Sequence, residues 1–327
     1  MTESTMHESD AAASDRPMEQ VLYEVKKVIV GQDNLLERLI VALLARGHVL
    51  VEGVPGLAKT MAVKTLAAAI GGDFHRVQFT PDLVPADLTG TRIYNQQKGE
   101  FATSLGPVFT NLLLADEINR APAKVQSALL EVMQERQVTI GRDTHSVPDP
   151  FLVMATQNPI ESEGVYPLPE AQVDRFMLKV LVDYPSLTEE FVIVERMTQT
   201  METVRQIVST DDLLAMQAKV DDVFVDPALI EFAVRVAAAT REPDRYVTHG
   251  ASPRASINLI LAGKALAFVR GRSYVMPADV ADLVHDVLRH RLVLSYEALA
   301  DDVNEAAIID RVLARVPLPD VPLQGHR

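Results

Sequence analysis

Apolar residues follow two different spacings in the first half of the chain. Between Val21 and Leu43 they recur every three or four residues, which is typical of amphipathic helices. Short apolar runs, which suit strands buried on both faces of a parallel sheet, lie at His48–Glu52, Phe74–Phe79, Asn111–Leu114 and Phe151–Ala155. Helical spacing occurs between these runs, at Lys59–Ile70 and Ala123–Glu135. The alternation predicts an α/β fold with a parallel sheet.

The pattern becomes helical almost throughout after Asp183, where Tyr184-Pro185-Ser186 interrupts it. Helices are predicted at Leu187–Met197, Thr210–Val220, Pro227–Thr240, Pro253–Val269, Pro277–His290 and Val303–Val316. We therefore expect an α/β core over residues 17–183 and a small all-helical domain over residues 184–316. Residues 1–16 lack apolar periodicity and are expected to form a disordered leader, and residues 317–327 a proline-rich tail.

The composition narrows the classes of function. Among 327 residues, 45 are Asp or Glu and 31 are Lys or Arg, so the net charge of −14 repels polyanions such as nucleic acids. There is no cysteine, which excludes disulfides, thiolate metal sites and a cysteine nucleophile. No apolar run reaches the length of about 18 residues that favours a membrane span, and Met1–Asp15 is too acidic for a signal peptide. We expect a cytoplasmic protein with no membrane span and no nucleic-acid partner.

A phosphate-binding loop is the first candidate for chemistry. The segment GVPGLAKT follows the first strand run and opens a helix, and its residues are Gly53, Val54, Pro55, Gly56, Leu57, Ala58, Lys59 and Thr60. It is nearly the motif G-x-x-x-x-G-K-[ST], with alanine in place of the last glycine. In such a loop the backbone N–H groups bind phosphates, the lysine contacts the β- and γ-phosphates, and the hydroxyl holds Mg²⁺. The alternative is a glycine turn that joins a strand to a helix, with an exposed lysine.

Two adjacent carboxylates, Asp116 and Glu117, follow the apolar run that ends at Leu114. In a phosphate-loop fold, an acid at the end of a neighbouring strand helps to bind Mg²⁺, and a second acid polarises the attacking water as a general base. This interpretation assigns Mg²⁺ binding to Asp116 and the general base to Glu117. Without the loop, the pair would more simply mark an acidic transition from a strand to a loop.

Three segments together resemble the MoxR group of AAA+ ATPases: GVPGLAKT, LLLADEINRAP and ATQNPIESEGVYPLPEAQVDRF. The loop of that family also has alanine at the place that Ala58 occupies here. The resemblance extends from about Val21 to Arg254 and beyond. It implies an AAA+ P-loop NTPase core followed by a helical lid domain. It also implies two inserted hairpins, at about residues 82–109 and 137–150, which in the family line the central pore or the ring face.

The resemblance also implies roles for residues outside the loop. Gly31 and Gln32 match the segment that lies against the adenine, and Asn158 matches the sensor-one position, which orients water. Arg175 is similar to the arginine finger, which acts across a subunit boundary, and Arg254 to sensor two at the start of a lid helix. The simpler alternative for Arg175 is a surface arginine paired with Asp174 or another nearby acid.

The function that this resemblance implies is ATP hydrolysis with Mg²⁺ in a homo-oligomeric, hexameric ring. The ring is expected to drive chaperone-like remodelling, maturation, or metal or cofactor insertion in partner proteins, often ones with a von Willebrand factor A domain.

Two alternatives come from other classes of function. One is an AAA+ relative that acts on nucleic acid, which the acidic composition disfavours. The other is a nucleotide-gated scaffold that binds ATP without hydrolysing it, which would need neither a base nor a finger.

Overall fold

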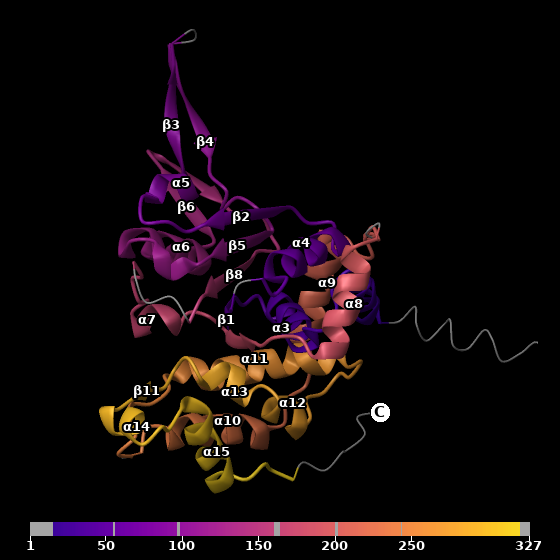
Figure 1. Ribbon diagram of the computed structural model, residues 1–327, viewed down its shortest axis with the longest axis vertical. Helices are drawn as coiled ribbons and strands as arrows, with labels where there is room; N and C mark the ends of the chain where they lie inside the picture. The colour runs from indigo at the N-terminus through magenta and orange to yellow at the C-terminus, as the bar shows by residue number, and fades with distance from the viewer. Residues whose placement is uncertain are drawn as a thin grey trace, which may run out of the picture. The chain divides into compact units, whose positions relative to one another are not determined.

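The computed structural model describes residues 16–320, apart from Pro55 and residues 97–98, 160–163, 200–201 and 243 (Figure 1). The expectations for residues 1–15 and 321–327 therefore lie outside the described residues. The chain forms two compact units. The first runs to Leu168 and resumes over Val180–Met216, and the second consists of Pro169–Lys179 and the chain from Gln217 onward.

This division differs from the expected boundary at Asp183. The chain after β9 (Leu178–Val182) stays with the first unit because it is bonded to the first helices. Arg196 donates to the carbonyl oxygens of Lys26 and Lys27, at 2.9 and 2.8 Å, and the Ile207 N–H donates to Ala69 O at 2.8 Å. Periodicity alone does not reveal these long-range hydrogen bonds. The change to a helical pattern after Asp183 therefore did not predict the boundary between the two units.

The first unit contains the expected parallel sheet. Its strands are β1 (Val49–Gly53), β2 (Phe74–Gln78), β5 (Leu112–Asp116), β8 (Leu152–Gln157) and β9, in the order β2-β5-β8-β1-β9. The pairs β2–β5, β5–β8 and β1–β8 are parallel. The α/β fold class is thus confirmed, although β9 was not predicted. The ends of β1, β5 and β8 meet at one edge of the sheet.

Helices surround this sheet and supply much of the core. They are α2 (Pro17–Lys26), α3 (Asp33–Leu44), α4 (Lys59–Ala69), α5 (Pro85–Thr89), α6 (Ala123–Glu135) and α8 (Leu187–Met197). Residues 112–115 of β5 are fully buried, as a strand covered on both faces must be. A short 3-10 helix, η1 (Ile118–Arg120), follows β5 and turns the chain toward α6.

Two antiparallel hairpins occupy the segments expected to be inserts. The first pairs β3 (Gly90–Asn95) with β4 (Glu100–Leu105), and the second pairs β6 (Gln137–Ile140) with β7 (Asp143–Ser146). In Figure 1 the β3–β4 hairpin extends well away from the sheet. Large apolar side chains on this hairpin are exposed, namely Ile93, Tyr94, Phe101 and Leu105.

The second unit is mainly helical. Its helices are α7 (Glu170–Val173), α10 (Pro227–Ala239), α11 (Pro253–Val269), α12 (Pro277–Ala281), α13 (Val284–Leu288), α14 (Tyr296–Ala300) and α15 (Glu305–Arg315), while α9 (Thr210–Asp221) leads into it from the first unit. The helix predicted over Pro277–His290 is in fact two helices, α12 and α13. The small pair β10 (Val247–His249) and β11 (Val293–Leu294) was missed, because such short strands leave no detectable alternation. Among the described helices, none combines the length and apolarity needed to cross a membrane.

Candidate nucleotide site

A cavity of about 940 Å³ lies in the first unit where β1, β5 and β8 end. The predicted site residues that line it are Gln32, Gly53, Gly56, Leu57, Ala58, Lys59, Thr60, Asp116, Glu117 and Asn158. Gly31 and Val54 are chain neighbours of this lining, and Pro55 lies outside the described residues. Arg175 and Arg254 belong to the second unit. The cavity is as large as the pockets that bind small molecules and cofactors, which span about 300–1,000 Å³.

The loop between β1 and α4 is shaped by residues with little or no side chain. A Cβ atom on Gly53 would lie only 2.5 Å from Val182 O, so no other residue fits there without movement. Gly56 and Ala58 have positive φ angles of 87° and 55°. This conformation costs a residue with a Cβ atom about 1–2 kcal/mol, which Ala58 bears. Among the described residues no side chain caps α4, so the first N–H groups of this helix are available for an anion.

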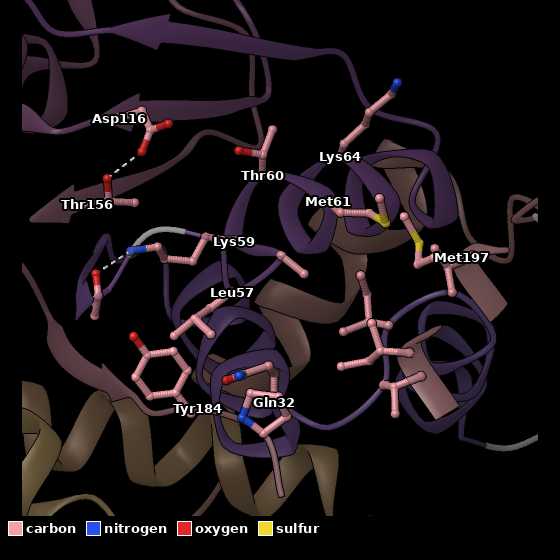
Figure 2. A pocket seen from close by; sticks show the side chains of 18 of the residues that line it. Gln32, Leu57, Lys59, Thr60, Met61, Lys64, Asp116, Thr156, Tyr184 and Met197 are labelled. Carbon is pink, nitrogen blue, oxygen red and sulfur yellow. Dashed lines mark hydrogen bonds between the residues drawn. The ribbon is translucent and has the colours of Figure 1, made fainter. Parts of the chain in front are cut away.

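Lys59 is the cation of this loop. Its Nζ atom donates to Gly53 O at 2.7 Å, which folds the side chain back over the loop (Figure 2). Burial lowers the pKa of Lys59, and the charges of Asp116 and Glu117 oppose this shift. A half-buried ammonium group that is bonded to one carbonyl retains donors for a phosphate oxygen.

Asp116 is held from two sides. Its Oδ1 atom accepts a hydrogen bond from the Thr156 hydroxyl at 2.6 Å, and its Oδ2 atom accepts from Arg76 Nε at 3.1 Å and Nη2 at 2.7 Å. Sequence reasoning missed both partners. Their signal is weak: Arg76 lies on β2, and Thr156 is one polar residue near the end of an apolar strand.

Glu117 has a left-handed backbone, with φ at 55°. Its N–H donates to the Thr156 hydroxyl at 2.9 Å, and its Oε2 atom accepts from Gln78 Nε2 at 2.7 Å and Arg120 Nη1 at 3.1 Å. The orientation of the Glu117 carboxylate is therefore fixed by hydrogen bonds from Gln78 and Arg120. Gln78 and Arg76 are two residues apart on β2 and so share one face of the strand. This spacing alone did not identify them, because it does not show that β2 lies beside β5.

The opposite part of the cavity is mainly apolar, although the lining also includes Lys64, Glu190 and Arg196. Val28, Ile29, Val30 and Met61 line this part. Sequence reasoning missed the contribution of α8, which supplies Ile193, Val194 and Met197. In Figure 2, Met61 and Met197 lie on one side of the cavity, and Lys59, Thr60 and Asp116 on the other. Such a division suits a ligand with an apolar base and a charged end.

Arg175 lies in the second unit between α7 and β9, and Arg254 lies in the first turn of α11. The alternative pairing of Arg175 with Asp174 is not observed. Asp174 instead accepts from Arg291 and Ser252, with Arg254 Nη1 at 3.7 Å. Within the part of the chain that the structure describes, no carboxylate pairs with the Arg175 guanidinium.

Comparison with known proteins identifies the family. Residues 48–178 match the ATPase family associated with various cellular activities (AAA), and residues 239–312 match the AAA lid domain. The chaperone MoxR1 of Mycobacterium tuberculosis is 59% identical over 326 residues, which cover 96% of this chain and 86% of that protein. The chain belongs to the MoxR family of AAA+ ATPases.

Other relatives of this MoxR-family chain are similar over nearly their whole length. The protein YeaC of Bacillus subtilis is 44% identical, with 90% of this chain and 92% of that protein covered. A crystal structure from Cytophaga hutchinsonii, of a protein identified there as a candidate ATPase, has a TM-score of 0.89 and 46% identity. It covers 96% of this chain and 98% of that one. The MoxR-family chain is accordingly an ATP hydrolase.

The site of this MoxR-family ATPase is chemically suited to Mg²⁺. Thr60 and Asp116 both line the cavity and offer oxygen ligands, which this hard cation prefers. No group of three or more His, Cys, Asp or Glu side chains among the described residues could hold a metal ion alone.

Proposed function

We propose that ATP binds in the cavity with its triphosphate at the N-terminus of α4. The observation that supports this most directly is that one cavity gathers the loop, Asp116, Glu117 and Asn158 from the ends of three strands. Lys59 neutralises the β- and γ-phosphates, while Thr60 and Asp116 hold Mg²⁺, which supplies charge neutralisation on the phosphate oxygens. The adenine lies on the apolar side, against the segment that ends at Gly31 and Gln32.

Hydrolysis in this proposal uses Glu117 as the general base. Gln78 and Arg120 both donate to its carboxylate and so fix where it points. Asn158, buried at the end of β8, orients the attacking water between Glu117 and the γ-phosphate. As the oxygen of the water attacks the γ-phosphorus, a proton of the water passes to the Glu117 carboxylate. The bond between the γ-phosphorus and the bridging oxygen to the β-phosphate breaks, and ADP and inorganic phosphate leave.

The proposed active form is a homo-oligomeric, hexameric ring in which Arg175 reaches the nucleotide of a neighbouring subunit. An arginine without a carboxylate partner is available for a transferring phosphoryl group. Arg254 serves as sensor two, which responds to the state of the nucleotide.

The ring is proposed to drive chaperone-like remodelling, maturation, or metal or cofactor insertion in partner proteins. The name of its relative MoxR1, a chaperone, supports this class of activity. Proteins with a von Willebrand factor A domain are the partners that the family resemblance suggests. A relative that acts on nucleic acid is the competing function, and filter binding at low salt discriminates it through tight, salt-sensitive retention.

Substitution Glu117→Gln tests the proposed chemistry. It should retain ATP and Mg²⁺ binding while phosphate release falls by roughly 10²–10⁴-fold, the usual contribution of a general base. Glu131→Gln, the same change on an exposed position of α6, is the matched control and should hydrolyse ATP normally. An unchanged rate for Glu117→Gln would show that Glu117 is only an acid at the end of a strand.

A further inference from the structure

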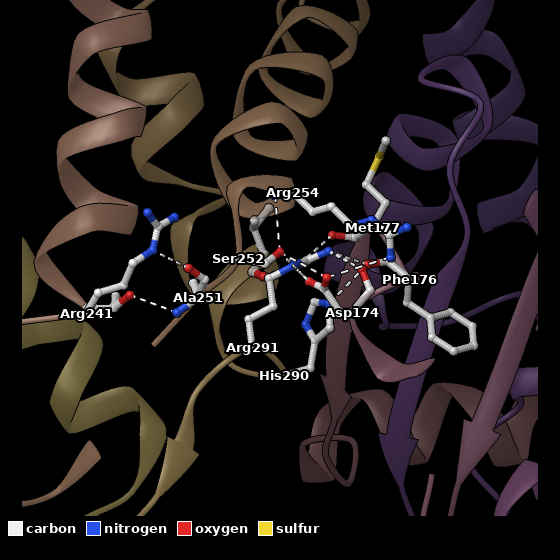
Figure 3. A network of polar contacts seen from close by, with 11 residues as sticks. Asp174, Phe176, Met177, Arg241, Ala251, Ser252, Arg254, His290 and Arg291 are labelled. Carbon is white, nitrogen blue, oxygen red and sulfur yellow. Dashed lines mark hydrogen bonds and ion pairs between the residues drawn. The ribbon is translucent and has the colours of Figure 1, made fainter. Parts of the chain in front are cut away.

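Arg291 in the second unit binds the chain on both sides of Arg175. Its guanidinium donates to Asp174 Oδ1 at 2.9 Å, Asp174 O at 3.1 Å, Phe176 O at 2.6 Å and Met177 O at 3.3 Å (Figure 3). A further bond goes to Val287 O, one turn earlier in the chain. These are five hydrogen bonds, as many as a guanidinium has N–H donors.

This arginine is buried, with a side chain that is only 1% exposed. Burial lowers the pKa of Arg291 to about 10, opposed by the Asp174 carboxylate, so the side chain stays charged at neutral pH. Next to it, His290 Nε2 lies 3.0 Å from Phe176 O and donates a second hydrogen bond to that oxygen. A buried charge is stable only when its donors are satisfied, and here three of the five acceptors are backbone carbonyl oxygens on either side of Arg175.

Arg175 itself is outside these bonds. Its neighbours Asp174 and Phe176 are held, while its own guanidinium has no carboxylate partner among the described residues. The preceding helix α7 has four residues, too few to be stable alone. The position of Arg175 is therefore set by the contacts that Arg291 makes on either side of it.

Asp174 connects the same segment to the start of α11. The Ser252 hydroxyl donates to both Asp174 carboxylate oxygens, at 3.0 and 2.9 Å, and accepts from the Arg254 N–H at 3.2 Å. The Arg254 guanidinium lies 3.7 Å from Asp174 Oδ2. The segment of Arg175 and the helix that bears Arg254 are thus joined through one carboxylate.

We propose that Arg291 is a positioning residue that holds Arg175 in the geometry needed to act on the neighbouring nucleotide. The inference rests on the proposed role of Arg175 as an arginine finger. Through Arg291 and Asp174, the finger is carried by the helical unit and moves together with Arg254. A change in Arg254 that accompanies the nucleotide cycle thereby reaches Arg175.

The same unit contains a matched control for a purely structural role. Asp279 is fully buried and accepts from Arg272 Nη1 at 2.5 Å and Nη2 at 2.6 Å, and from Arg270 Nη1 at 2.9 Å. None of these residues is a predicted site residue. Arg272→Lys should lower the midpoint of thermal unfolding, as Arg291→Lys should, but leave turnover within a few-fold.

The test is the substitution Arg291→Lys, which keeps the charge but loses the planar fork that reaches several carbonyls at once. We expect ATP affinity to be unchanged and turnover to fall by about 10²-fold, because small misplacements of a catalytic group have effects of this size. In an Arg175→Ala background the same substitution should cause no further loss, since no finger is left to be misplaced. Mixed with Glu117→Gln subunits, which have an intact finger, Arg291→Lys subunits should regain activity.

Other outcomes overturn the inference. If Arg175→Ala is defective but Arg291→Lys turns over normally, or if the two losses multiply, Arg291 does not act through Arg175. If Arg175→Ala itself is fully active, the proposed role of Arg175 as an arginine finger is wrong, and the inference about Arg291 loses its basis. Should Arg291→Lys not fold, Asp174→Asn replaces it in the same experiments: ATP affinity and turnover alone, turnover in the Arg175→Ala background, and recovery in a mixture with Glu117→Gln subunits. This variant removes the carboxylate but leaves the carbonyl contacts of Arg291 in place.

Discussion

The candidate nucleotide cavity and the Asp174 cluster (Asp174, Ser252, Arg254 and Arg291) both gather charged side chains, but they balance charge differently. In the cavity, the Lys59 ammonium is half-buried and donates to one carbonyl. In the cluster, Arg291 is buried and makes five hydrogen bonds. The cavity keeps donors available for a ligand, whereas the cluster uses its donors within the protein. This difference separates side chains that can bind a ligand from side chains that hold other residues in position.

The largest expected effect concerns Arg175, which lies next to Asp174 in the chain and is proposed to act on the nucleotide of a neighbouring subunit. Arg175→Ala should bind ATP normally and hydrolyse it on the order of 10³–10⁵-fold more slowly, the contribution of an arginine finger in well-studied enzymes. If the finger acts between subunits, a mixture of Arg175→Ala and Glu117→Gln subunits should partly recover activity. Some interfaces then combine an intact Glu117 with an intact Arg175. Phosphate release from the mixture measures this recovery.

Tagged pull-down must first show that the two variants enter the same ring. With mixing established, an inactive mixture would mean that Arg175 acts within its own subunit or not at all. The ring mechanism would then be abandoned for this protein.

A smaller effect is expected for Lys59→Ala, which should weaken ATP binding in the cavity with little effect on the stability of the fold. Loss of a charge-assisted bond of about 1.5–3 kcal/mol should weaken ATP binding by roughly 10–150-fold. The free energy of unfolding without ATP should change by less than about 1 kcal/mol, because few internal contacts depend on Lys59. Titration with a fluorescent ATP analogue and chemical denaturation measure the two quantities, with exposed Lys124→Ala as the control. Normal affinity would refute the loop assignment.

The smallest effect is a dependence of stability on pH in which both units take part. Burial lowers the pKa of His48 from 6.5 to about 3, and that of His290 well below 6.5. Because the unfolded state binds protons that these folded histidines do not, stability is complete above about pH 6.5 and falls as the pH drops below it. Each histidine contributes up to about 1.4 kcal/mol per pH unit.

Urea unfolding between pH 7 and pH 5 measures this dependence. His48 accepts from the Val153 N–H at 3.0 Å and bonds Met133 O at 3.1 Å, which the amide of a glutamine can imitate. His48→Gln should therefore reduce the slope, whereas His75→Gln, on an exposed position, should not. An equal slope in both variants would exclude His48 as a source.

Much of the candidate site could be predicted because its parts are contiguous in the chain. A strand, a glycine-rich loop and a helix place Lys59 and Thr60 by local geometry alone. The acids at 116 and 117 end a strand that any parallel sheet would bring to the same edge. Gln78 and Arg76 could not be recognised in this way, because their function depends on which strand lies beside β5.

The amino-acid sequence by itself determined the α/β class, the phosphate loop, the acidic pair and most helices, since each follows from periodicity or a short motif. Only the tertiary structure decided the boundaries of the two units, the strand β9 and the partners of Asp174. Asp174 meets Ser252 and Arg291 across 78 and 117 positions of sequence. Bonds over such separations depend on how the helices pack, and no local pattern of apolar and polar residues records that packing.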